Sequence, residues 1–240
     1  MSEVFGNSNF NDYLRNDGKI YGVMVGVVIM NDSSNDGSKP GPGLVKLKIP
    51  LIGMEESNWA RISSFMSGNS RGSFFLPEVG DEVLVAFENG DVNRPFVIGS
   101  LWNGKDAPPE TNSDGKNNTR LIKSRSGHIF KFFDKKGEEN IELKTSKGHI
   151  IRLDDKSGEE NIQIVDKSGN NKIIISTKEN KITLSSDKDI EISAPKGKFS
   201  VNAKEIELKS SANTKVEASA AMDLKASANM TVKGAMVNIN

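Results

Sequence analysis

The sequence predicts an all-β protein in which a small closed barrel is followed by a long, repetitive β-rich region. Three observations carry this prediction. Apolar and polar residues alternate over short stretches, which is the period of a strand. Gly, Asn and Ser cluster between those stretches, as they do in turns. The second half of the chain repeats itself at fixed spacing, which is typical of a repeat architecture.

Composition excludes several classes of protein. The 240 residues contain 32 basic and 32 acidic side chains, so a dominant partner among nucleic acids or anionic membranes is not expected. Because the chain has no cysteine, it can form neither disulfides nor a thiolate metal site. The N-terminus lacks the pattern of a signal peptide, and the apolar run 23–30 is too short to span a bilayer.

The first half is expected to form a barrel of the OB type over residues 19–105. Five strands separated by long polar loops fit such a barrel, and Asn89-Gly90 predicts a hairpin between the last two. Residues 1–18 are a separate N-terminal segment, and the Pro-containing polar stretch 106–119 is a linker. The expected strands are 19–30, 44–50, 58–64, 81–91 and 94–104.

A unit of 21 residues repeats after the linker. Gly127-His128-Ile129 recurs at residues 148–150, and residues 137–141 recur at 158–162. Each unit is predicted to contain two strands joined by a glycine turn. The equivalent histidines, His128 and His149, are interpreted as turn-adjacent side chains, with Ile129 and Ile150 facing the interior.

Towards the C-terminus the period shortens to about eight residues, with two apolar residues per octad. The Ala-rich end keeps this spacing, which a helix of 3.6 residues per turn has no reason to do. Strand is therefore predicted to the end of the chain, against alanine's helix propensity. The predicted core residues of this region are Ile182, Leu184, Ile190, Ile192, Phe199, Val201, Ile206, Leu208, Val216, Leu224 and Val232.

An octad with two inward side chains is a poor core for one chain. Three identical chains wound together would place about 24 residues in each turn, which is comparable to one solenoid coil. Winding also removes exposed sheet edges. The spacing therefore predicts that residues 120–240 form an intertwined homotrimeric β-helix, with a monomeric solenoid as the alternative.

Residues 75–103, FLPEVGDEVLVAFENGDVNRPFVIGSLWN, resemble the central spike proteins of contractile injection machines, including phage baseplate assembly protein V and the VgrG proteins of type VI secretion. Trp59-Ala60-Arg61 resembles the preceding strand of that family, whereas Val92 departs from its usual proline. The matching residues are Pro77, Gly80, Asp81, Glu82, Val83, Phe87, Gly90, Asp91, Arg94, Pro95, Gly99, Leu101 and Asn103.

The resemblance implies an OB-fold collar followed by a trimeric β-helical needle that pierces a target envelope when a sheath contracts. It implies a separate baseplate hub at the barrel end, which the N-terminal segment 1–18 is expected to contact, with the inner tube or cargo as further candidate partners. Because no signal peptide is visible, synthesis in the cytoplasm is expected, and the resemblance implies assembly into a phage-tail-like particle or injection apparatus. The large hub domain and the enzyme domains of some relatives have no counterpart here, so no enzyme activity and no cofactor are expected.

The last residues are expected to bind a conical tip protein of the PAAR-repeat kind. Three copies of the terminal strand would form a blunt, partly apolar end with unpaired backbone groups. The predicted contact residues are Met236, Val237, Ile239 and Asn240.

Two other classes of function stay open. One is an OB-fold module that binds carbohydrate or nucleic acid, and the other is a cell-wall hydrolase on a β-solenoid. The sequence singles out no catalytic or metal-binding residues for either: the acidic residues 81–82, 88 and 91 lie in a motif that the fold explains, and the tail has no histidine.

Overall fold

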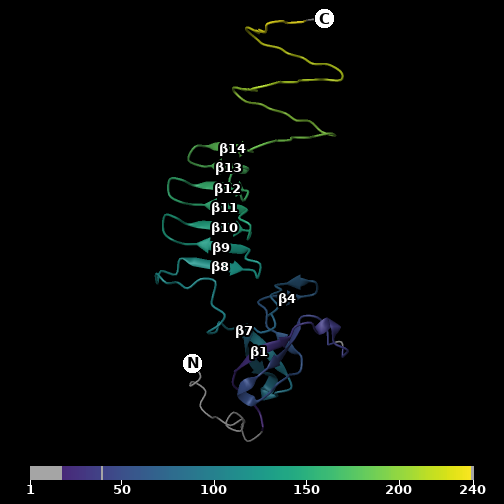
Figure 1. Cartoon of the computed structure of the whole chain (residues 1–240), viewed down its shortest axis with the longest axis vertical. Coiled ribbons are helices and arrows are strands. Elements are labelled where there is room, and N and C mark those ends of the chain that lie inside the picture. The colour runs from purple at the N-terminus through teal and green to yellow at the C-terminus, as the bar shows by residue number, and fades with distance from the viewer. Residues whose placement is uncertain (1–17, 39, 239–240) are drawn as a thin grey trace. The chain divides into compact units, whose positions relative to one another are not determined.

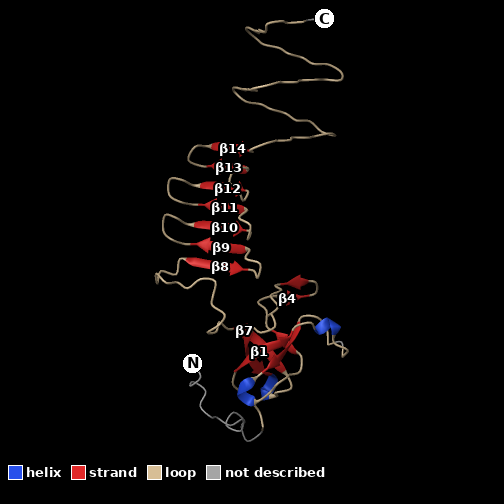
Figure 2. Ribbon diagram, viewed as in Figure 1, coloured by secondary structure: helices blue, strands red, loops and turns tan. Residues whose placement is uncertain are grey.

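The structure is a computed structural model that describes residues 18–38 and 40–238. It divides into a unit that ends at Asp187 and a second unit that begins at Lys188. The first unit contains a barrel and a separate antiparallel sheet, and the second is an extended tail (Figures 1 and 2). No helix among the described residues is long and apolar enough to cross a membrane.

Five strands close the barrel in the order β1-β2-β3-β7-β6. All neighbours are antiparallel except β3 and β7, which are parallel. Each strand overlaps one of the five predicted strands, so the predicted barrel is confirmed. The bounds are β1 (Met24–Met30), β2 (Leu44–Lys48), β3 (Ala60–Ile62), β6 (Glu82–Phe87) and β7 (Pro95–Ser100).

The barrel core comes from residues that alternate along the strands, as the pleat of a strand requires. In β2, Val45 and Leu47 are fully buried, while Lys46 between them reaches the surface and pairs with Glu56 at 2.6 Å. The other buried apolar residues are Ile20, Met24, Val28, Ile49, Ala60, Val83, Val85, Phe87 and Val97.

The β6–β7 hairpin turns where Asn89-Gly90 predicted it. Both residues have positive φ, 52° and 77°, in the short 3-10 turn η4 (Glu88–Gly90). The Gly90 carbonyl accepts a hydrogen bond of 3.0 Å from the Ile20 N–H, and a Cβ on Gly90 would lie 2.9 Å from that of Lys19. Glycine therefore lets the segment before β1 pack against this turn. The other 3-10 turns are η2 (Ser33–Asn35) and η3 (Pro50–Ile52).

A small hairpin, β4 (Ser67–Gly68) and β5 (Arg71–Gly72), interrupts the glycine-rich loop between β3 and β6. The polar stretch after β7 contains no strand until Thr119, where the next sheet begins. The predicted linker, residues 106–119, thus lies between the two sheets except for its last residue, which belongs to β8.

Seven antiparallel strands follow as a simple meander in the order β8 to β14. The 21-residue repeat corresponds to the strand pairs β9–β10 and β11–β12, so the prediction of two strands per unit is confirmed. This part of the chain pairs with itself in chain order and does not wind as a coil. The bounds are β8 (Thr119–Lys123), β9 (Ile129–Phe133), β10 (Asn140–Lys144), β11 (Ile150–Asp154), β12 (Asn161–Val165), β13 (Lys172–Ser176) and β14 (Lys181–Ser185).

The tail from residue 189 has neither a helix nor a β-ladder within its described part. Its single backbone–backbone hydrogen bond over residues 189–238 runs from the Gly197 N–H to the Ala194 carbonyl at 3.1 Å. Bends recur at 187–188, 195–197, 204, 211–212, 219–220, 227–228 and 235, which keeps the predicted octad spacing. Figure 1 shows the tail as an open zig-zag whose successive segments are not paired.

Candidate functional site

One face of the β8–β14 sheet is apolar except for Arg120 on β8, and we call it the apolar face. Its side chains form two rows in which each residue directly opposes the next across the strands. The first row takes one residue from each strand: Ile122, Phe130, Leu143, Ile151, Ile164, Ile173 and Leu184. The second row is Arg120, Phe132, Ile141, Leu153, Ile162, Ile175 and Ile182.

No part of the described chain, residues 18–38 and 40–238, covers the apolar face. Its aliphatic side chains are between 38% and 72% exposed, with Ile141 at the low end and Ile182 at the high end. Contiguous apolar patches of this kind mark interaction surfaces, because leaving them in water is costly. Each half-exposed Ile or Leu that became buried would contribute roughly 1 kcal/mol. Arg120 on β8 is the one charged side chain in the two rows, and it is paired with Asp134.

The opposite face is mainly polar and carries an ion-pair ladder across three strands. Glu142 on β10 is directly opposed by Lys131 on β9 and by Arg152 on β11. The Arg152 Nε donates to Glu142 Oε2 at 2.9 Å, and the Lys131 Nζ lies 3.6 Å from Oε1. These neighbours cover the carboxylate, so the residue is only 4% exposed.

Burial by itself raises the pKa of Glu142, but the hydrogen bond from Arg152 and the charges of Arg152, Lys131 and Lys144 outweigh it. The pKa of this carboxyl is therefore held below its ordinary value of 4.5. A depressed carboxyl pKa adds stability above the unfolded value, and that stability disappears as the pH falls through the folded value.

We predict that Glu142→Gln lowers the free energy of unfolding by about 1–3 kcal/mol at pH 7, because the amide cannot replace the ion pairs. The deficit relative to the unchanged protein should shrink as the pH falls below about 4. Denaturant unfolding across that pH range measures it. Glu138→Gln is the control, since its pair with Lys135 is exposed and should contribute less than about 1 kcal/mol. A deficit independent of pH would contradict the electrostatic origin.

The predicted core residues fall on two parts of the molecule. Ile182 and Leu184 end the two rows of the apolar face on β14. The others lie on the tail between successive bends, and each is more than half exposed. The single chain therefore does not bring them together, and their role as a trimer core stays a prediction. Of the predicted tip contacts, Met236 and Val237 are exposed, whereas Ile239 and Asn240 lie outside the described residues.

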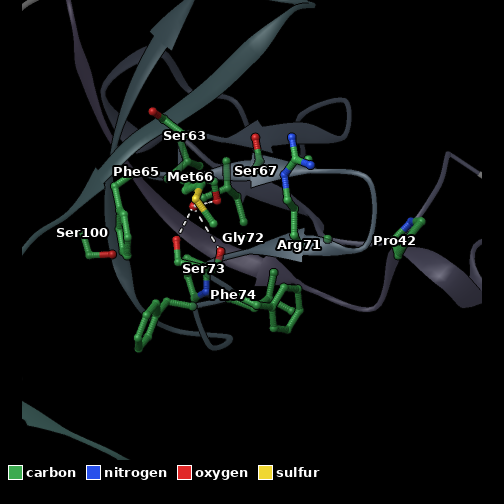
Figure 3. A pocket seen from close by; sticks show the side chains of 18 of the residues that line it. Pro42, Ser63, Phe65, Met66, Ser67, Arg71, Gly72, Ser73, Phe74 and Ser100 are labelled. Atoms are coloured by element: carbon green, nitrogen blue, oxygen red, sulfur yellow. Dashed lines mark hydrogen bonds between the residues drawn. The ribbon is translucent and has the colours of Figure 1, made fainter. Parts of the chain in front are cut away.

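A second apolar surface surrounds a cavity of about 820 Å³ beside the β4–β5 hairpin (Figure 3). Phe65, Met66 and Phe74 lie around it and are strongly exposed. Two short links hold the loop: the Ser64 and Ser73 hydroxyls are 2.5 Å apart, and the Ser73 N–H donates to the Met66 carbonyl at 3.0 Å.

The lining of this cavity contains one titratable side chain, Arg71. It therefore lacks the acid–base pair that a hydrolase of the inverting or retaining type needs. Within residues 18–38 and 40–238 there is also no group of three or more potential metal-ligating His, Cys, Asp or Glu side chains. These surfaces are suited to apolar packing rather than to acid–base chemistry.

The motif 75–103 occupies β6, β7 and the loops at their ends, and its residues have clear structural roles there. Val83 and Phe87 face the core, Gly80 and Gly90 adopt positive φ, and Arg94 pairs with Glu88 at 2.8 Å. Residues 24–102 match the family described as the type VI secretion system/phage-baseplate injector OB domain. The barrel is an injector OB domain. The resemblance noted in the sequence is thereby confirmed for this part of the chain.

The chain is also distantly homologous to VgrG spike proteins. It is 34% identical over 110 residues to the actin cross-linking toxin VgrG1 of Vibrio cholerae serotype O1, and 32% identical over 110 residues to the spike protein VgrG3 of the same species. It is 30% identical over 111 residues to the spike protein VgrG1c of Pseudomonas aeruginosa. These alignments cover 41–42% of this chain but only 10–15% of the relatives, so the matched segment spans about a tenth of their length.

Sequence reasoning missed most of the apolar face. The signal was present, because every strand from β9 to β14 carries apolar residues two apart. Ile129 and Ile150, which were expected to face the interior, both oppose Lys144 on the polar face, while Phe130 and Ile151 lie on the apolar face. Their place in the interior of an assembly stays a prediction. The glycine turns decide at which residue each strand begins, and therefore on which face of the sheet each side chain lies. Composition alone does not reveal this.

Proposed function

We propose that the protein is a homotrimeric puncturing spike at the centre of a contractile injection apparatus. The observation that carries this proposal is the apolar face of β8–β14, which has no partner in one chain and ends on Ile182 and Leu184. The octads of the tail continue the same spacing of two apolar residues. Further copies of the same chain would bury both regions, since each copy carries the same apolar pattern along its whole length.

We propose three copies because three octads make one turn of about 24 residues if each bend turns the chain through one third of a circle. With three chains interleaved, each chain would descend three strand spacings per turn, about 14 Å. The wide gap between successive segments of the tail would then hold strands from the other two chains, whose backbone groups would complete the ladder.

Such a spike is suited to transmitting mechanical force without unfolding. Separating interwound chains would require breaking many backbone hydrogen bonds together, which gives high kinetic stability. The injector OB domain would join the spike to a separate hub. A conical tip protein would cover the C-terminal end, where Met236 and Val237 are exposed. A tip protein retained by the full chain and lost on deletion of residues 236–240 would support that contact, while undiminished retention would exclude it.

Solution mass tests the proposal. We expect light scattering to give about 78 kDa, three times the chain mass of 26.1 kDa. The trimer should also survive SDS without boiling, because its unfolding is slow. A stable monomer would remove the basis for the spike. In that case a zymogram on peptidoglycan and salt-dependent binding of oligonucleotides would distinguish the hydrolase and the nucleic-acid-binding alternatives.

A further inference from the structure

The turns of the β8–β14 meander share one backbone feature. Each contains a residue with positive φ, the conformation that closes a tight turn and that glycine or asparagine adopts most readily. These residues are Gly127, Gly137, Gly148, Gly158, Gly169 and Asn180. After Asn180, no described residue of the chain has positive φ, including Gly197 and Gly234. The pattern of hairpin reversal therefore ends at β14.

The residues after β14 are held in place by the turn between β12 and β13. The Asn171 Oδ1 accepts hydrogen bonds from the Ser186 hydroxyl at 2.9 Å and from the Asp187 N–H at 3.1 Å. The Asn170 Nδ2 donates to Asp187 Oδ2 at 2.6 Å. These contacts occupy the backbone and side chain of Asp187 at the position where a further hairpin would have to begin.

β14 is the edge strand of its sheet, because β13 is its one neighbour in the described chain. An open edge is a template for another strand. The two rows of the apolar face end here on Ile182 and Leu184. The same spacing resumes eight residues later, on Ile190 and Ile192, after the bend at 187–188.

We propose that Ser186–Lys188 is a crossover point, at which each chain leaves its own sheet and the next segment, 189–193, pairs with the β14 edge of a second copy. This inference rests on the proposed trimer. In a three-fold assembly with octad spacing, residue i + 8 of one chain lies beside residue i of its neighbour. The pairing is parallel, because a chain that bends without reversing keeps circling the axis in one direction.

Pairing of Asp189–Ser193 with its own β14 is the competing arrangement. A three-residue hairpin at 186–188 would also place residue 191 opposite residue 183, but in an antiparallel pair within one chain. The two arrangements therefore bring the same two positions together, and they differ in whether the positions belong to one chain or to two.

Thr183 and Glu191 consequently make a decisive pair for cross-linking in the full-length protein. The chain has no cysteine, so the double variant Thr183→Cys/Glu191→Cys introduces the only thiols. Neighbouring strands place Cα atoms within the range that a disulfide bridges. The matched control is Ile174→Cys/Thr183→Cys, because Ile174 directly opposes Thr183 within one chain.

After mild oxidation and boiling in SDS without reductant, we expect the 183/191 variant to run at three times the chain mass and to return to one on reduction. The 174/183 control should run as a cross-linked single chain. A 183/191 variant that is a native trimer by light scattering, yet cross-links within one chain or not at all, overturns the crossover and leaves the spike standing. A native monomer overturns both.

Discussion

Ile164→Asp is expected to abolish the trimer. Ile164 lies in the middle of the first row of the apolar face, directly between Ile151 and Ile173. In the proposed spike, the substitution places three carboxylates close to one axis without partners. Leaving one charge buried and unpaired costs several kcal/mol, and three copies also repel one another. Light scattering should then show a mass near that of one chain.

Gln163→Asp is the matched control, since its side chain points to the opposite face, where Arg152 opposes it. We expect this variant to keep the trimer mass. Ile164→Val should also keep it, because the change removes one methylene without adding charge. A trimer that tolerates Ile164→Asp as well as Gln163→Asp would show that the apolar face is not the interface.

The second large effect is expected in the barrel, where Leu47→Ala should lower the free energy of unfolding by about 2–5 kcal/mol. Leu47 is fully buried and lies next to the last residue of β2, so truncation leaves a cavity that its neighbours cannot fill completely. Both tryptophans of the chain, Trp59 and Trp102, belong to the barrel or to its end. Tryptophan fluorescence during denaturant unfolding therefore follows this domain selectively.

Val25→Ala provides the comparison, because Val25 lies on β1 but is 40% exposed. Its effect should be much smaller than that of Leu47→Ala. The trimer mass should not change in either variant, since neither residue lies on the apolar face. A loss of trimer with Leu47→Ala would mean that assembly depends on the barrel rather than on the β8–β14 sheet and the tail.

Local patterns were sufficient for much of the fold. Alternation in β2 and β6 predicted buried strands, Asn89-Gly90 predicted the β6–β7 hairpin, and the 21-residue repeat predicted pairs of strands. Each of these features depends on residues that are close in sequence, such as a positive-φ turn or a two-residue period. For that reason they are visible without knowledge of distant contacts.

Other features depended on contacts between residues that are far apart in the sequence, or on contacts with other molecules. The sequence suggested a wound coil over the whole region from residue 120, but β8–β14 is a meander that pairs with itself. Which isoleucines share a face was decided by the register across strands, which places Ile129 and Ile150 together opposite Lys144. The β4–β5 hairpin, with the exposed side chains of Phe65 and Phe74 near it, also had no clear local signal in the sequence.

By itself, the sequence determined the all-β class, the five barrel strands, the family motif and the octad spacing, because turn chemistry and side-chain periodicity are local properties. Only the tertiary structure decided that two apolar rows run unbroken from β9 to β14 and that hairpin reversal stops after Asn180. The first arises from the hydrogen-bonded register, which fixes the face of every side chain at once, and the second from the backbone conformation of the turns. A shift of one residue would have moved the apolar rows to the other face.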